Sequence, residues 1–145
     1  MLRKTILALA LLVAGCGGAT PSPQTVRAKA RASVDLAKDA WVLMANACVD
    51  AVTTTGDATL AAKCGKPLEV AHDLIVSAAV AVDTNWNTSA SCNLENAVDL
   101  IASALPLVGA AAPGIAPTVL DAVSAAQLGA GTLCQHNPPA DAGAE

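Results

Sequence analysis

The spacing of apolar residues over positions 25–52 constrains this fold more than any other feature of the sequence. Apolar side chains recur there at alternating steps of four and three, at Ala30, Val34, Ala37, Trp41, Met44, Cys48 and Ala51. Such steps place them all on one face of an α-helix. No segment alternates apolar and polar residues as a half-buried strand does. The sequence therefore predicts an all-α protein.

Turn formers and helix breakers divide the first half of the chain. The run at residues 53–56, which ends in Gly56, closes the first helix, and Asp57 is a candidate N-cap for a second. Gly65 and Pro67 interrupt that second segment, and Pro67 suits the first turn of a new helix. A stripe at helical spacing then continues to Val82, so an interrupted second helical segment is expected.

The second half predicts two further helices. Residues 84–91 are turn formers and predict a loop. A third helix is expected over residues 93–108, kinked or ended by Pro106, and a fourth over residues 118–134. Short connections between helices favour a small antiparallel four-helix bundle, which we place at residues 25–136.

The core of this bundle must consist of small aliphatic side chains. The chain of 145 residues has two Trp but no Phe and no Tyr, and 54% of it is hydrophobic. This hydrophobic content, with only 14% charged residues, excludes a disordered chain. Each small side chain buries little area, at ~25 cal/mol per Å². Covalent crosslinks are therefore expected to help stabilise the fold.

The N-terminus has the pattern of an export signal. A basic start with Arg3 and Lys4 precedes an apolar run at residues 5–14. That run is too short to span a bilayer, which takes ~20 residues. The segment Leu12-Val13-Ala14-Gly15-Cys16 then resembles the lipobox of bacterial lipoproteins, which has an aliphatic residue, two small residues and an obligatory cysteine.

This resemblance implies a location. In that family, diacylglycerol is attached to the cysteine, here Cys16, the signal peptide at residues 1–15 is removed, and the new amine is acylated. Several acyl chains anchor a protein stably in a membrane. In the enteric-type sorting rule, an Asp directly after the lipidated cysteine retains the protein in the inner membrane. This chain has Gly17 at that position, so the resemblance implies the periplasmic side of the outer membrane. Residues 16–24 then form a flexible tether, and residues 137–145 a disordered tail.

Four cysteines remain for the helical domain, namely Cys48, Cys64, Cys92 and Cys134. An even number in a small exported domain indicates disulfides. An antiparallel bundle brings Cys48 near Cys64 at one end, and Cys92 near Cys134 at the other. We therefore predict these two pairs among the three possible connectivities. No CxxC pair suggests a redox or zinc site.

The loop after the second helix partly resembles a calcium-binding loop. Oxygen-bearing side chains occur at Asp83, Asn85, Asn87 and Ser91, with Glu95 one residue beyond the position of the bidentate acid. Thr88 replaces the glycine that makes the sharp turn. The alternative is a capping loop, in which these side chains bond the backbone. A calcium site here is a weak candidate, and no metal or other cofactor is expected besides the lipid on Cys16.

Other catalytic patterns are incomplete. Glu69 and His72 form one Glu-x-x-His half of a di-iron bundle site, but the second half is missing, since the other histidine, His136, is expected in the tail. A GxSxG elbow, a phosphate-binding loop and a free cysteine nucleophile are absent from the sequence. The sequence therefore predicts a protein that is not an enzyme.

Charge distribution bears on the partners. Every base after the signal lies before residue 67, so no basic patch extends over the domain and a nucleic-acid partner is not expected. The cluster at Arg27, Lys29 and Arg31 either contacts anionic headgroups or is a solvated helix face. Acidic positions that could contact an envelope protein are Asp73, Asp83, Glu95 and Asp99.

Three functional hypotheses follow. We favour a lipid-anchored, periplasm-facing binding or scaffold module of the cell envelope. The first alternative is a membrane-active lysis or exclusion lipoprotein that uses residues 100–120, an uncharged stretch of membrane-span length. We read that stretch as a buried helical hairpin. The second alternative is a calcium-responsive helical domain.

Overall fold

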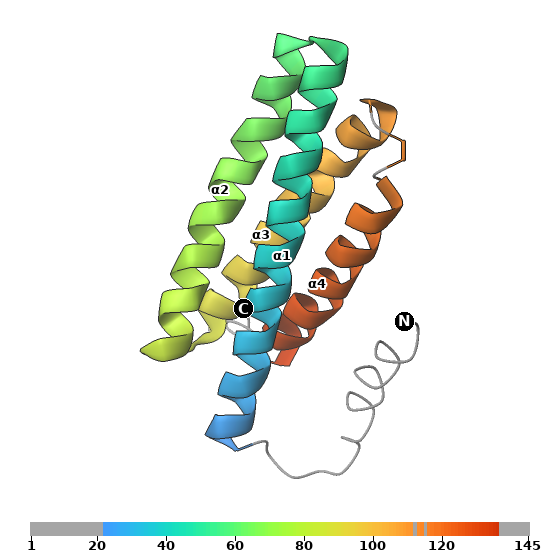
Figure 1. Cartoon of the computed structure of the whole chain (residues 1–145). Helices are drawn as coiled ribbons and strands as arrows, with labels where there is room; N and C mark the ends of the chain where they lie inside the picture. The colour runs from blue at the N-terminus through green and yellow to red at the C-terminus, as the bar shows by residue number, and fades with distance from the viewer. Residues whose placement is uncertain (1–21, 112, 115, 137–145) are drawn as a thin grey trace, which may run out of the picture.

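The computed structural model describes residues 22–111, 113–114 and 116–136, all within four helices and their short connections. The helices are α1 (Pro23–Thr55), α2 (Ala58–Asp83), α3 (Thr88–Ala111) and α4 (Ala116–His136). They run up and down as an antiparallel bundle (Figure 1). The all-α four-helix prediction is confirmed. The predicted signal peptide, Cys16, most of the predicted tether and the predicted tail at residues 137–145 lie outside the described residues.

Helix α1 begins earlier than expected. The Ser22 side chain caps it by accepting a hydrogen bond from the Thr25 backbone N–H, and Pro23 occupies the first turn, where its missing N–H costs nothing. Pro23 and Gln24, expected in the tether, are therefore helical. The helix ends at Gly56, whose φ of 68° allows its N–H to bond the Val52 carbonyl at 2.8 Å.

Helix α2 is continuous, and the predicted interruption at Gly65 and Pro67 is wrong. Asp57 caps it as predicted, accepting from the Thr59 N–H at 2.8 Å. A proline inside a helix removes one backbone hydrogen bond. Here Cys64 and Leu68, on either side of Pro67, are both buried in the bundle. We attribute the continuity of the helix to this tertiary packing, which outweighs the local cost.

Helix α3 also begins earlier and passes through its proline. Only residues 84–87 connect it to α2. The helix begins at Thr88 because the Asn87 Oδ1 accepts the Ala90 N–H at 2.9 Å and satisfies an N-terminal donor. Pro106 lies within the helix between the buried residues Ala104 and Val108. The helix therefore does not end at Pro106, while the alternative prediction of a kink there stays a prediction.

The helices pack around one core in which alanine is the commonest buried residue. Helix α1 contacts all three other helices, including α3 across the diagonal of the bundle. Within the described residues, no Cα atom of α2 lies within 8 Å of one in α4. Ala37 and Ala40 on α1 are fully buried, and side chains of this size let helices in the core approach closely. Met44, Leu94 and Ile101 fill the centre and are 0% exposed.

Two disulfides crosslink the helices in the predicted pairs. Cys48 of α1 is bonded to Cys64 of α2 with a Cα–Cα distance of 6.2 Å. Cys92 of α3 is bonded to Cys134 of α4 at 4.8 Å. The first lies toward the α1–α2 turn and the second toward the opposite end of the bundle, so each half of the bundle is a covalently closed hairpin.

Candidate functional site

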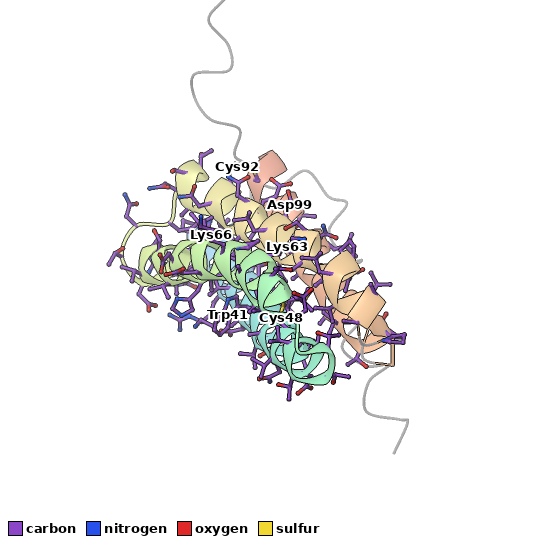
Figure 2. The ribbon with its side chains drawn as sticks, turned by 90° about the horizontal axis from the view of Figure 1, so that it is seen from above. Trp41, Cys48, Lys63, Lys66, Cys92 and Asp99 are labelled. Carbon is purple, nitrogen blue, oxygen red and sulfur yellow. A yellow bond between two sulfur atoms is a disulfide. The ribbon has the colours of Figure 1, made fainter. Side chains whose placement is uncertain are left out.

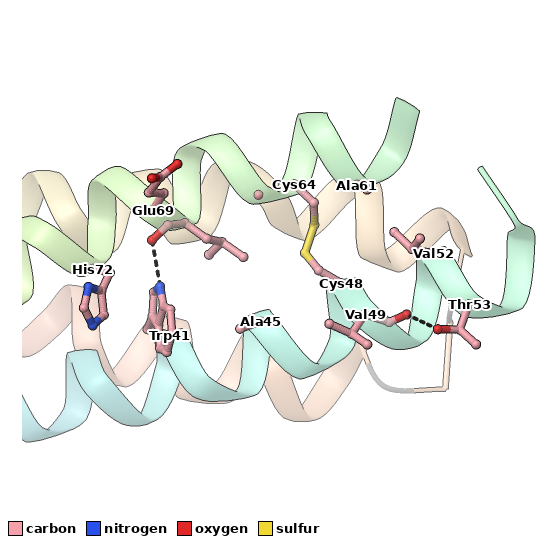
Figure 3. Close-up of a pocket in the computed structure, with 12 residues that line it drawn as sticks. Trp41, Ala45, Cys48, Val49, Val52, Thr53, Ala61, Cys64, Glu69 and His72 are labelled. Carbon is pink, nitrogen blue, oxygen red and sulfur yellow. Dashed lines mark hydrogen bonds between the residues drawn. A yellow bond between two sulfur atoms is a disulfide. The ribbon is translucent and has the colours of Figure 1, made fainter. Parts of the chain in front are cut away.

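A groove of about 510 Å³ runs along the outer side of the seam between α1 and α2 (Figure 3). Its lining is mostly aliphatic or sulfur-containing. Twelve residues form it: Trp41, Ala45, Cys48, Val49, Val52, Thr53, Ala61, Cys64, Gly65, Leu68, Glu69 and His72. A hollow of this size with an apolar lining and a few polar groups is typical of a ligand site.

Trp41 forms one end of the groove and is held there from two sides. Its indole N–H donates a hydrogen bond to the Leu68 carbonyl of α2 at 2.7 Å (Figure 3). Its ring also lies beside the His72 imidazole, with the ring centroids 4.9 Å apart and the planes tilted by 48°. These contacts fix the indole across the seam. They also occupy its only hydrogen-bond donor.

The groove exists because small residues face one another across the seam. Ala45 on α1 and Ala61 on α2 line it, and Gly65 has no side chain at all. A Cβ atom added at Gly65 would meet no atom within 4 Å. The Cys48–Cys64 disulfide crosses the seam along the groove. These residues leave an open channel where larger side chains would close the surface.

Large apolar side chains are exposed to solvent at the rim of the groove and beside it. Val49 lines the groove and is 63% exposed. Val42 on α1 and Val76 on α2 are also exposed large apolar residues. On α1, Val42 lies one helical turn before Ala45 and two turns before Val49, on the same face of the helix. On α2, Val76 lies one turn after His72. The exposed apolar surface therefore extends beyond the groove along both helices, which indicates a contact site.

Charge near the groove is negative. Among its described lining residues Glu69 is the only one with a formal charge at neutral pH. Asp73 follows on α2, with its Oδ1 3.6 Å from the His72 Nδ1. The α2 lysines, Lys63 and Lys66, lie on the other side of that helix from Trp41 (Figure 2). The Trp41 end of the groove thus favours a positively charged or hydrogen-bond-donating group.

Three residues of the calcium candidate, Asp83, Asn87 and Ser91, have partners within the protein. Asp83 forms an ion pair with Arg31 of α1. Asn87 caps α3, and the buried Ser91 hydroxyl donates to the Asn87 carbonyl at 3.1 Å. Asn85 is exposed in the connection. This is the capping arrangement that the sequence left open as the alternative, and calcium binding stays a prediction.

Glu95 lies in a different cluster, beside the second disulfide. Ligand atoms of Cys92, Glu95 and Cys134 lie within 4.8 Å of one another. Metal binding by cysteine requires a thiolate, and these two sulfur atoms are bonded to each other. The cluster therefore has only the Glu95 carboxylate to offer while the disulfide is intact. The remaining acidic candidate, Asp99, accepts a hydrogen bond from Gln127 of α4 at 3.3 Å.

The half-site Glu69 and His72 is brought to the groove, where both residues lie one turn apart on α2. The other histidine, His136, is the last residue of α4 rather than part of the tail. Sequence reasoning found these two groove residues but not the groove. The available signal was the occurrence of small residues on both helices, Ala45 on α1 and Ala61 and Gly65 on α2, along one seam. It becomes visible only once the two helices are aligned.

Helix α3 is long and apolar enough to cross a membrane by length and composition, the one such helix in the part of the chain described. One third of its most apolar window is buried in the bundle. Ile101, Ala104 and Val108 of this helix are 0% exposed. The stretch at residues 100–120 thus comprises the end of α3, the connection and the start of α4, and its apolar face contributes to the core.

No protein-family description, curated protein or solved structure matches this chain.

Proposed function

We propose that the chain is a bacterial lipoprotein, anchored by lipid on Cys16 in the outer membrane, whose helical domain faces the periplasm as a non-catalytic binding module. The observation that carries the proposal is the cysteine pairing. Of five cysteines, four form two disulfides within the bundle, and the fifth, Cys16, is the last residue of the lipobox-like segment. Paired cysteines accord with an oxidising compartment such as the periplasm.

The binding role is supported by the groove between α1 and α2. Its lining is largely aliphatic, with Glu69 and His72 at one end, and its rim extends the apolar surface. Such a surface suits recognition of an apolar ligand or of another envelope component. The acidic side chains of Asp73, Asp83 and Asp99 around the bundle add exposed positions for a basic partner surface.

The anchoring proposal is tested by the intact mass of the protein purified from bacterial membranes, combined with labelling by a radioactive fatty acid. We expect a chain that begins at Cys16, carries diacylglycerol and an amide-linked acyl group, and has lost the hydrogens of four thiols. Cys16→Ser should abolish the label and leave an uncleaved, unlipidated chain. A wild-type chain that begins upstream of Gly15 and has open thiols would overturn the proposal.

The membrane-active alternative is disfavoured by burial. Insertion of α3 would withdraw Ile101 and Val108 from the core and separate α3 from α4, to which the Cys92–Cys134 disulfide ties it. Its test is flotation of the Cys16→Ser protein with liposomes after the signal segment has been removed by a protease. We expect the helical domain to stay in the soluble fraction, and co-flotation would favour the alternative.

A further inference from the structure

We propose that the groove between α1 and α2 binds the alkyl chain of a single-chain amphiphile whose polar head is cationic, with the head at the Trp41 end. This inference rests on the proposed binding function and names the class of ligand. It is carried by two properties of the groove, an elongated aliphatic lining and the chemistry of its Trp41 end, where Glu69 and His72 also lie.

The lining matches an extended alkyl chain. From Trp41 to Val52 the groove follows α1 for eleven residues, which at 1.5 Å per residue is about 17 Å. Between these ends it is lined by the side chains of alanine, valine and leucine, the bridged sulfur atoms and the bare backbone of Gly65. These groups offer contact surface but almost no hydrogen bonds. An alkyl chain needs only such contact, because its affinity comes from removing methylene groups from water.

The Trp41 end selects the charge of the head. The indole N–H already donates to the Leu68 carbonyl, so it is not available to an anionic or carbonyl-bearing head. The indole ring itself lines the groove beside His72, and aromatic rings attract cations and are common partners of quaternary ammonium groups. Glu69 lines the same end, and Asp73 follows His72 on α2, so the formal charges beside this end are negative. An anionic head placed there would meet like charge.

The experiment uses the full chain with both disulfides formed and Trp86→Phe, which leaves Trp41 as the only indole. Trp86 lies in the α2–α3 connection and its buried N–H has no hydrogen-bond partner, so this change removes no polar contact. Alkyltrimethylammonium salts of increasing chain length are titrated below their critical micelle concentrations. We expect a saturable change in Trp41 fluorescence, with Kd falling about fourfold for each added methylene until the groove is filled.

Two substitutions at Gly65 locate the site. Gly65→Leu projects a side chain into the open space and should weaken binding of the dodecyl compound at least tenfold. Gly65→Ala is the matched control, because its Cβ meets nothing within 4 Å and should leave most of the groove open. Circular dichroism establishes that both variants retain the wild-type helix content. Binding to Gly65→Leu as tight as to the wild type would overturn the proposed site.

Head-group specificity is tested with three dodecyl probes, namely the trimethylammonium, the sulfate and the uncharged maltoside. We expect the cation to bind most tightly and Glu69→Gln to weaken it about two- to fivefold while leaving the maltoside unchanged. Val49→Asn, in the exposed wall, should weaken all three and keeps the site testable if Gly65→Leu misfolds. Equal affinity for the sulfate, or no saturable response to any probe, would refute the proposal. Because these titrations do not depend on lipid at Cys16, failure of the anchoring proposal would be seen separately.

Discussion

The two disulfides should stabilise the bundle by different amounts, because they close loops of different length. In the chain-entropy view, a crosslink stabilises the fold by restricting the unfolded chain. The Cys48–Cys64 bond spans a sequence separation of 16 and the Cys92–Cys134 bond one of 42. The corresponding loop-closure terms are about 3 and about 4 kcal/mol at 25 °C. The longer bond, which encloses most of α3 and α4, should therefore contribute about 1 kcal/mol more.

Simple replacement of the cysteines would not isolate these terms. The sulfur atoms of Cys48 and Cys64 are buried, with residue exposures of 6% and 1%, so their replacement also removes core packing. We therefore propose two variants in a Cys16→Ser background, Cys48→Ala with Cys64→Ala, and Cys92→Ala with Cys134→Ala. Each retains one disulfide. Urea unfolding is then measured for each variant with and without reductant, so that the compared proteins differ only in that bond.

The expected result is a loss of about 4 kcal/mol on reduction of the variant that retains Cys92–Cys134, and about 3 kcal/mol for the one that retains Cys48–Cys64. In the parent chain, reduction breaks both disulfides. Its free energy of unfolding should therefore fall by about the sum of the two single losses, since the two loops do not overlap. Small domains have about 5–15 kcal/mol in total, so the reduced parent should be marginal or unfolded. A larger loss from the shorter loop, or a reduced parent as stable as the oxidised one, would refute the reasoning.

Three further predictions concern single positions. Gly129→Ala should lower the free energy of unfolding by about 1 kcal/mol, because its Cβ would lie 3.0 Å from the Ser33 Oγ and this crowding outweighs the gain in helix propensity; added Ser33→Ala should restore stability in the same urea assay. Trp41→Phe should cost about 1 kcal/mol in thermal unfolding through loss of the indole hydrogen bond, and an unchanged melting temperature would contradict this. Hydrogen bonds from the Thr59 hydroxyl and backbone hold the pKa of Asp57 below its usual 3.8. The Asp57 carboxylate therefore stabilises the fold at higher pH, and this contribution is lost as the pH falls through the lowered pKa. Asp57→Asn, which caps without titrating, should show a shallower acid decline of melting temperature than the wild type, and equal slopes would speak against the cap.

The sequence was sufficient for the fold class and the disulfide pairing because both follow from helical spacing and the order of the cysteines. It failed at Pro67, where an interruption was predicted, and in the predicted end of the third helix at Pro106, since both helices continue through their prolines. A local rule gives the cost of one missing backbone bond, but the packing of Leu68 and Val108 on the core is a property of the whole bundle. Early helix starts at Pro23 and Thr88 have a different cause. Ser22 and Asn87 cap these helices, but each lies in a run of turn-forming residues that the sequence assigns to a connection.

The groove could not be predicted from the sequence because it forms between two helices, and neither helix has an unusual sequence by itself. Ala45 on α1 and Gly65 on α2 are unremarkable separately, and a hollow forms only where the seam aligns them. Small side chains also dominate the buried core, where α1 contacts α3 across the diagonal of the bundle. A bundle made of small residues thus packs tightly where alanines meet on the inside and leaves open space where they meet at the surface. The Cys48–Cys64 bond lies at the junction of these two regions. It holds the walls of the groove together where few side chains could do so, and ligand affinity should therefore fall when this bond is reduced.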